Sequence, residues 1–154
     1  MIDYEKFVKY SKPGPRYTSY PTAPEFSENF KQEDLKDFYK KQDKNRALSL
    51  YIHLPFCRSA CYFCGCNNIF TSKEDKKTRY IEYLKKELNI LKNHLDTSRV
   101  ITQMHFGGGT PTYFSPQQLE DVIKSIKTIF PNFSSDAEIS CEVDPRYFTK
   151  EHMD

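Results

Sequence analysis

Apolar and polar side chains alternate along residues 46–154 in a way that predicts strands and helices in turn. Residues 47–54, ALSLYIHL, form a short apolar run, which is typical of a strand buried on both faces. Residues 74–96 carry apolar side chains at steps of three and four, which predicts one buried helix face. Further strands are expected over 100–106 and 137–143. The helix face consists of Ile81, Leu84, Leu88, Leu91 and Leu95.

A second helix is expected to begin after Ser115. The segment SPQQ at 115–118 combines an N-cap serine, a proline at the first helical position and a capping-box glutamine. Thr149 is expected to cap a third helix, of which only the first turn is present. Strand–helix–strand repeats of this length predict parallel strands with right-handed crossovers, so the fold class is α/β. Because three such strands do not complete a domain, we expect the sequence to be part of a longer protein.

The first 45 residues have a different character, and we divide the chain into 1–45 and 46–154. Residues 11–26, SKPGPRYTSYPTAPEF, contain four prolines and one glycine, which exclude a regular helix and a central strand. An extended arm is expected there, followed by a short helix around Leu35. A mobile extension is the alternative, although the tyrosines of the arm are costly to leave in water.

The balance of charge changes this picture little. The 154 residues carry 23 basic and 21 acidic side chains, a net charge of +2, which gives no bias toward nucleic acid or an anionic membrane. The N-terminus has no apolar segment typical of a secretory signal, and the apolar run 47–57 is too short for a membrane span. We therefore expect a cytoplasmic protein with no nucleic-acid or membrane partner. The lysines between 73 and 92, Lys77 among them, are expected on a solvated helix face.

Four of the five cysteines lie within ten residues of one another, in a loop directly after the first expected strand. Cysteine thiolates are the ligands of iron–sulfur clusters, and Cys57-x3-Cys61-x2-Cys64 can hold three irons of a [4Fe–4S] cluster while the fourth iron stays open. A zinc site and inert buried thiols are the alternatives, but zinc sites usually pair two short cysteine motifs across a longer loop. Cys141 stands apart and is expected to be a core thiol.

Two more features follow the next two strands. Gly107-Gly108-Gly109-Thr110 comes after the second strand, and Glu142 ends the third. Each has a purely structural interpretation, as a tight turn or a structural carboxylate. The carboxyl ends of parallel strands meet at one edge of a sheet, where ligands bind in α/β folds. Their coincidence with the cysteine loop therefore favours a ligand site, at which glycines let the backbone approach the ligand.

Together these motifs resemble the radical S-adenosylmethionine (SAM) enzymes, whose signature is Cys-x3-Cys-x2-Cys followed by a glycine motif after the next strand. The resemblance narrows to the family of oxygen-independent coproporphyrinogen III oxidases, also called coproporphyrinogen dehydrogenases. The segments that carry it are YIHLPFCRSACYFCGCN at 51–67, HFGGGTPTYFSP at 105–116, AEISCEVDPR at 137–146 and the arm PGPRYTSYPTAPEF at 13–26. The fourth cysteine, Cys66, separates this family from its haem-chaperone relatives, which typically lack it and the arm.

The resemblance implies a role for each matching residue. A [4Fe–4S] cluster would be bound by Cys57, Cys61 and Cys64, and SAM would chelate its open iron. The first SAM would contact Tyr51, Gly108 and Glu142. A second SAM would lie near Phe63, Gly109 and Thr110. The catalytic candidates are Cys66, which would not bind the cluster, His53 for proton handling, and Arg16 for the carboxylates of the substrate. A structural role for His53 stays open.

The reaction implied by the resemblance is the oxidative decarboxylation of two propionates of coproporphyrinogen III, giving protoporphyrinogen IX. An electron-donor protein would supply the electron with which the cluster cleaves SAM to methionine and a 5′-deoxyadenosyl radical. The family's core is a partial (β/α)6 barrel, so residues 46–154 would be its first half, and we expect the whole protein to be a monomer. The 154 residues alone are expected to be inactive, with inner residues such as Tyr51 and Met104 open to water.

Two other functions remain open. A haem chaperone on the same scaffold would bind haem without oxidising a porphyrinogen. A zinc-binding interaction module would use the cysteines for a structural metal ion.

Overall fold

The computed structural model describes residues 3–11 and 22–153. The chain forms two compact units, Met1–Leu35 and Lys36–Asp154. The first contains α1 (Tyr4–Tyr10) and a 3-10 helix, η1 (Ala23–Glu25), and α2 (Gln32–Lys40) crosses the boundary, where the sequence predicts a short helix. Most of the proline-rich arm, Arg16 included, lies outside the described residues. Within the described part of the chain, no helix is both long enough and apolar enough to cross a membrane.

A three-stranded parallel sheet is the centre of the second unit, as the sequence predicts. It contains β1 (Leu48–Leu54), β4 (Ile101–Gly108) and β5 (Phe133–Cys141) in the spatial order β1-β4-β5. Two short strands, β2 (Phe56–Cys57) and β3 (Ile69–Phe70), pair in parallel and close the loop that carries the cysteines. Sequential parallel strands joined by helices give the α/β arrangement expected of the first part of a barrel.

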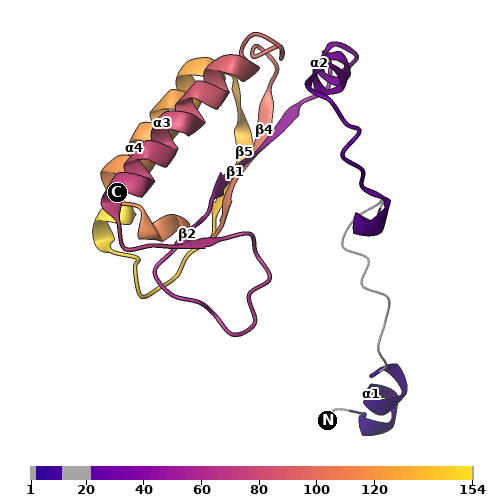
Figure 1. The fold of residues 1–154 in the computed structure, drawn as a ribbon, viewed down its shortest axis with the longest axis vertical. Helices are drawn as coiled ribbons and strands as arrows, with labels where there is room; N and C mark the ends of the chain where they lie inside the picture. The colour runs from indigo at the N-terminus through magenta and orange to yellow at the C-terminus, as the bar shows by residue number, and fades with distance from the viewer. Residues whose placement is uncertain (1–2, 12–21, 154) are drawn as a thin grey trace. The chain divides into compact units, whose positions relative to one another are not determined.

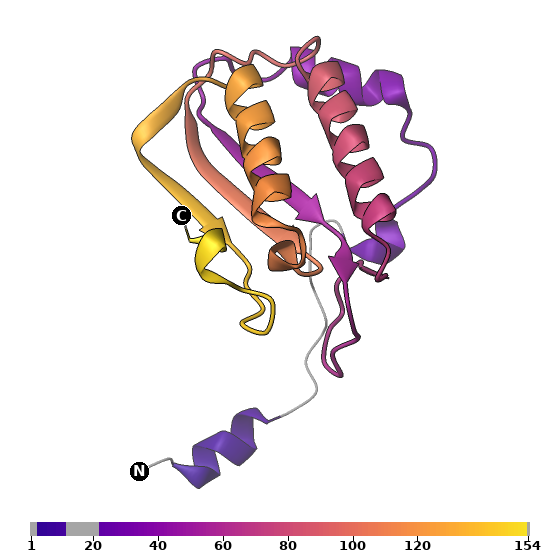
Figure 2. The same ribbon diagram turned by 90° about the vertical axis from the view of Figure 1, so that its left-hand side faces the viewer.

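Two helices, α3 (Glu74–Leu91) and α4 (Pro116–Ile129), lie side by side on one face of the sheet (Figures 1 and 2). The predicted capping box is present, since the Ser115 hydroxyl accepts from the Gln118 amide and the Gln118 side chain accepts from the Ser115 amide. Between helices and sheet lies the core. Its buried side chains include Ile52, Leu54, Ile81, Leu88, Ile101, Met104, Phe106, Val122, Ile126 and Phe130.

The opposite face of the sheet is polar and open to solvent. Ser49, Gln103 and Glu138 form one row across the three strands, and Tyr51, His105 and Ser140 form the next. The prediction of a strand buried on both faces is therefore wrong for β1, where buried and exposed positions alternate. Met104 lies on the helix side and is 1% exposed, whereas Tyr51 is 59% exposed on the polar face. Of the two inner residues expected from the sequence, only Tyr51 is on that face.

Other boundaries and burials also differ from the sequence prediction. β5 runs from Phe133 to Cys141 instead of over 137–143, and α3 ends at Leu91 instead of near 96. Cys141 is exposed and is not a core thiol. Lys77 is 3% exposed instead of solvated, because its ammonium group donates to the carbonyl of Tyr113 at 2.7 Å and lies over that ring.

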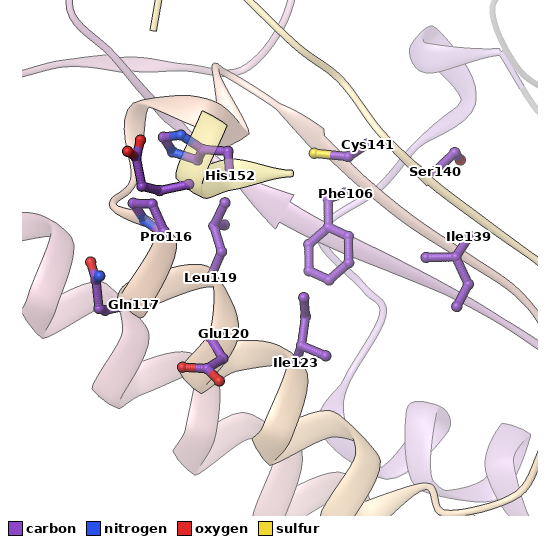
Figure 3. A pocket seen from close by; sticks show the side chains of 11 residues that line it. Phe106, Pro116, Gln117, Leu119, Glu120, Ile123, Ile139, Ser140, Cys141 and His152 are labelled. Carbon is purple, nitrogen blue, oxygen red and sulfur yellow. The ribbon is translucent and has the colours of Figure 1, made fainter. Parts of the chain in front are cut away.

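The edge of the sheet next to β5 is incompletely covered on the helix side. A groove of about 470 Å³ runs there between α4 and β5. Figure 3 shows Leu119 and Ile123 of α4 facing Phe106 of β4 and Ile139 of β5 across it, with His152 of the short helix η3 (Lys150–His152) at one end. In a repeating βα architecture this is the position of a helix that follows β5.

Candidate functional site

The carboxyl ends of the three long strands meet at a cavity of about 600 Å³. The loop between β2 and β3 projects from the same end of the sheet (Figure 1). The cavity is lined by this loop, by the segment that follows β4 and by the segment that follows β5. Its lining includes Cys61, Phe63, Cys64, Gly109, Thr110, Glu142 and Arg146. Features that are far apart in the sequence are thus brought together, as the parallel topology predicts.

The cysteine loop is buried where it begins and exposed to solvent in its middle. Cys57 is buried at the end of β2, whereas Cys61, Cys64 and Cys66 are exposed. The backbone amide of Cys64 donates to the carbonyl of Cys61 at 3.2 Å. The side-chain amide of Asn68 donates to the Cys64 sulfur at 3.5 Å. A hydrogen bond with Cys64 raises the pKa of the Cys66 thiol. Among the described residues, no three acidic, histidine or cysteine groups are close enough together to hold one metal ion.

The donor set nevertheless fits an iron–sulfur cluster. The four irons of a cubane occupy separate corners, so its thiolate ligands lie further apart than the ligands of a single ion. One thiol, on Cys57, is anchored by the sheet, and two others, on Cys61 and Cys64, line or adjoin a cavity with room for an inorganic core. Cysteine thiolates are the usual ligands of such a cluster.

Gly107 and Gly108 at the end of β4, and Gly109 directly after it, each make close contacts that leave little room for a side chain. A Cβ on Gly107 would approach the side chains of His105, Tyr51 and Glu142 to 3.0–3.2 Å. Gly108 has a φ of +114°, which side chains rarely tolerate, and its Cβ would come within 2.6 Å of the His53 ring. A Cβ on Gly109 would lie 2.6 Å from the backbone of Pro55. Gly107 and Gly108 thus let polar side chains lie close to the backbone, and Gly109 lets two backbone segments approach each other.

A hydrogen-bonded row connects β1 with the cysteine loop. Nε2 of His53 donates to the carbonyl oxygen of Asn67 at 2.9 Å, because a carbonyl can only accept. In the neutral ring Nδ1 then accepts from the hydroxyl of Tyr51, at 3.0 Å. Both ring nitrogens are therefore engaged. Burial, Glu142 and Cys66 raise the pKa of the Tyr51 hydroxyl, so this group stays protonated and able to donate.

A second group of contacts orients Glu142. The amide of Gly108 donates to Oε2 of Glu142 at 3.1 Å, and Nε2 of His105 lies 3.8 Å from Oε1. The His105 ring stacks on Tyr51 with centroids 5.8 Å apart, and its Nδ1 is 2.7 Å from the hydroxyl of Ser140. A carboxylate, a phenol and an imidazole thus share one patch beside Gly107. Such a patch can bind the ammonium or hydroxyl groups of a polar ligand.

Backbone pairing places Thr110 next to the first cysteine. The amide of Gly109 donates to the carbonyl of Leu54 at 2.9 Å, and the amide of Thr110 donates to the carbonyl of Phe56 at 3.1 Å. These bonds continue the pairing of β1 with β4 beyond the strands. As a result the Thr110 hydroxyl donates to the Cys57 sulfur at 3.4 Å.

Comparison with known proteins places this site in a family. Residues 51–154 match the radical SAM superfamily. The chain is 64% identical to the oxygen-independent coproporphyrinogen III oxidase of Helicobacter pylori strain J99, over 99% of its own length. It is 45% identical to the protein of the same name from Mannheimia haemolytica, covering 93% of this chain and 96% of that protein. The chain belongs to the oxygen-independent coproporphyrinogen III oxidase family of the radical SAM superfamily.

The structure agrees with this membership. It is similar to the solved coproporphyrinogen III oxidase (HemN) of Escherichia coli, described as a radical SAM enzyme, with a TM-score of 0.80 and 41% identity over 94% of this chain and 31% of that one. The chain spans about a third of the length of the H. pylori relative, 34% by alignment.

The candidate site brings together most of the residues singled out from the sequence. Tyr51, His53, Gly108 and Glu142 lie together around Gly107, while Thr110 contacts Cys57. Phe63 lies on the cavity wall and is 93% exposed. Arg16 is outside the described residues.

Sequence reasoning missed His105, Asn68 and Arg146. His105 alternates in phase with Gly107 along β4, which was the available signal for a residue on the site face. Arg146 lines the cavity and pairs with Asp144 at 2.7 Å. The Asn68 contact depends on how the loop folds back, and spacing alone does not reveal it.

Proposed function

We propose that this chain forms the cluster- and SAM-binding part of an oxygen-independent coproporphyrinogen III oxidase. In this proposal Cys57, Cys61 and Cys64 hold a [4Fe–4S] cluster, and Cys66 stays unligated. The observation that carries it is the convergence of the cysteine loop, the glycine segment and Glu142 on one cavity at the carboxyl ends of three parallel strands. The family names of the relatives supply the substrate, coproporphyrinogen III.

The side chains of the inner face bind and orient the first SAM. Glu142 offers the carboxylate oxygen that faces His105, since its other oxygen already accepts from Gly108. The Tyr51 ring, held between His53 and His105, offers a flat surface and a hydroxyl. Because both nitrogens of His53 are hydrogen bonded, we propose that His53 positions Tyr51 and the cysteine loop. When bound and reduced, the cluster supplies the electron for cleavage of SAM.

A second SAM is proposed at the outer part of the same cavity. Phe63 is exposed there, and Gly109 and Thr110 also line this cavity. Cys66 and Arg16 are retained as catalytic candidates, Arg16 for the substrate's carboxylates. The reaction proposed is oxidative decarboxylation of two propionates to vinyl groups, with an electron-donor protein as source of the reducing electron. The protein's part is orientation and exclusion of water from the radical.

A chimaera tests the function of the whole. Residues 1–154 replace the corresponding segment of the H. pylori relative, and the purified chimaera is reconstituted anaerobically with iron and sulfide. With SAM, a reductant and coproporphyrinogen III, it is expected to form protoporphyrinogen IX. The matched control carries Cys61→Ala in the same chimaera and is expected to give no product.

The outcomes separate the competing functions. A chimaera that holds an iron–sulfur cluster but binds haem without turnover indicates a haem chaperone. A chain that takes up zinc and no acid-labile sulfide indicates an interaction module. The unfused 154 residues are expected to assemble the cluster and to give no turnover, because a closed, dry site requires the remainder of the barrel.

A further inference from the structure

We propose that Thr110 and Asn68 tune the reduction potential of the cluster by donating hydrogen bonds to two of its three ligating sulfurs. The inference rests on the proposed assignment of Cys57, Cys61 and Cys64 as ligands. The Thr110 hydroxyl is 3.4 Å from the Cys57 sulfur, and the Asn68 amide is 3.5 Å from the Cys64 sulfur. No described side chain donates to Cys61 in this way.

The Thr110 contact is fixed by the sheet. The amide of Thr110 is bonded to Phe56, the residue directly before Cys57, so the two side chains cannot easily separate. Thr110 also occupies the N-cap position of η2 (Pro111–Tyr113), where a threonine hydroxyl normally accepts from a backbone amide of the first turn. It makes no such cap bond. Its hydroxyl is turned to the sulfur instead, which a capping role does not explain.

The hydrogen bond from Asn68 to Cys64 is more exposed to solvent than the one from Thr110 to Cys57. Asn68 lies in the part of the loop that His53 ties down through the carbonyl of Asn67. Cys64 is exposed, so water competes for its sulfur, whereas Cys57 is buried. We therefore expect Thr110 to have the larger effect and Asn68 the smaller.

The direction of the effect follows from charge. One-electron reduction of a cluster makes the cluster and its sulfurs more negative. A hydrogen-bond donor stabilises the more negative state more strongly, and hydrogen bonds to the sulfurs are among the factors that set cluster potentials. Removing a donor therefore lowers the potential and makes reduction harder.

Redox titration of the reconstituted 154-residue chain tests this without SAM and without turnover. The reduced cluster is followed by electron paramagnetic resonance as mediators set the potential. Thr110→Val keeps the shape and the extended backbone preference of threonine but lacks the hydroxyl. We expect it to reduce the equilibrium constant for cluster reduction about tenfold, or about 59 mV for one electron. Asn68→Leu is expected to shift it less, and Thr110→Ser to restore the original potential.

The matched control is Thr71→Val. Thr71 directly follows β3, the strand that closes the same loop, but its hydroxyl accepts from the amide of Lys73 and no hydrogen bond to a sulfur is made. An unchanged potential in Thr71→Val with a lowered one in Thr110→Val supports the inference. Equal potentials in Thr110→Val, Thr110→Ser and the original chain, all with full iron and sulfide, would overturn it and leave the cluster assignment intact. Failure of the original chain to assemble a cluster would overturn the assignment and the inference together.

Discussion

The two loops that meet at the site are built in opposite ways. Gly107 and Gly108 end β4, and Gly109 directly follows it. A Cβ on Gly108 or Gly109 would lie 2.6 Å from the His53 ring or the Pro55 backbone, and a Cβ on Gly107 would be crowded by side chains at 3.0–3.2 Å. Gly65, in the middle of the cysteine loop, has nothing within 4 Å of its Cβ position. The glycine segment is therefore ordered by the protein's own packing, whereas the cysteine loop offers its thiols to solvent.

This difference indicates where the free energy of the site comes from. The glycine segment forms as the sheet folds, so the free-energy cost of ordering it is included in the stability of the domain. The proposed cluster would add order to the exposed part of the cysteine loop, as metal binding commonly contributes to folding. Substitutions in the two loops should thus separate fold stability from cluster content.

The largest expected effect is complete loss of the cluster. Replacing Cys57, Cys61 or Cys64 by alanine should abolish cluster assembly, because each leaves one iron corner without a protein ligand. Iron and acid-labile sulfide after anaerobic reconstitution measure this. The apo-protein's urea midpoint should be almost unchanged for Cys61→Ala and Cys64→Ala, since both side chains are exposed.

Cys66→Ala is the matched control, one residue beyond Gly65 in the same loop. It should retain iron and sulfide at the level of the original chain. Iron loss comparable to that of the other three would show that the ligand assignment is wrong.

Gly109→Ala should have the opposite effect, a loss of fold stability. Its Cβ would lie 2.6 Å from both the carbonyl carbon and oxygen of Pro55. Backbone cannot yield as a flexible side chain can, so we expect a loss of about 2–3 kcal/mol in the free energy of unfolding. Gly65→Ala, with open space around it, should change this free energy by less than about 0.5 kcal/mol. Urea unfolding followed by circular dichroism compares the two, and equal losses would contradict the contrast between the loops.

The outcome at these loops also shows what the sequence can reveal. Motif spacing and the parallel topology were enough to bring the cysteine loop, Gly108 and Glu142 to one edge. Spacing could not say which face of β1 is buried, because ALSLYIHL is apolar in composition, yet Tyr51 and His53 lie on the polar, solvent-exposed face of the sheet. Such an assignment depends on which neighbours cover each face.

The sequence also predicted the burial of two individual side chains wrongly. Lys77 resembles its charged neighbours in sequence, but the turn η2 happens to place a carbonyl and two aromatic rings around its ammonium group. Cys141 alternates like a core residue, yet it lies on the edge strand, beside the uncovered groove. Both are decided by tertiary contacts with distant segments, which local patterns do not encode.

Lys77→Met tests the packing of η2, the turn that follows the glycine segment. Methionine fills the aliphatic space but leaves the carbonyl of Tyr113, in η2, without its 2.7 Å donor. Leaving this part-buried carbonyl unsatisfied costs about 1–3 kcal/mol, so the free energy of unfolding measured in urea should fall by that amount. The exposed Lys76→Met on the same helix is the control and should have little effect. A stable Lys77→Met variant would mean that the ammonium group does not hold η2.

The smallest effect is a pH dependence at the end of β5. Hydrogen bonds from the Arg146 side chain to Asp144 lower the pKa of Asp144 below its ordinary value of 3.8. A lowered folded-state pKa means that the ion pair stabilises the fold fully above about pH 4 and that this stabilisation disappears as the pH falls through the folded-state value. Because Arg146 is largely exposed, with a side chain that is 59% accessible, solvent screens the ion pair and we expect only a small contribution to stability.

Asp144→Asn isolates this contribution from the other carboxylates. The difference in free energy of unfolding between the original chain and Asp144→Asn should be positive at about pH 6 and should shrink toward about pH 2, where the native aspartate is itself protonated. Asn keeps the shape and can still accept from the amide of Arg146, so the loss reports the charge. Arg146→Gln should give the same profile, and combining it with Asp144→Asn should add almost nothing. A difference that stays constant with pH would mean that Asp144 supports the third strand end through shape and not through its charge.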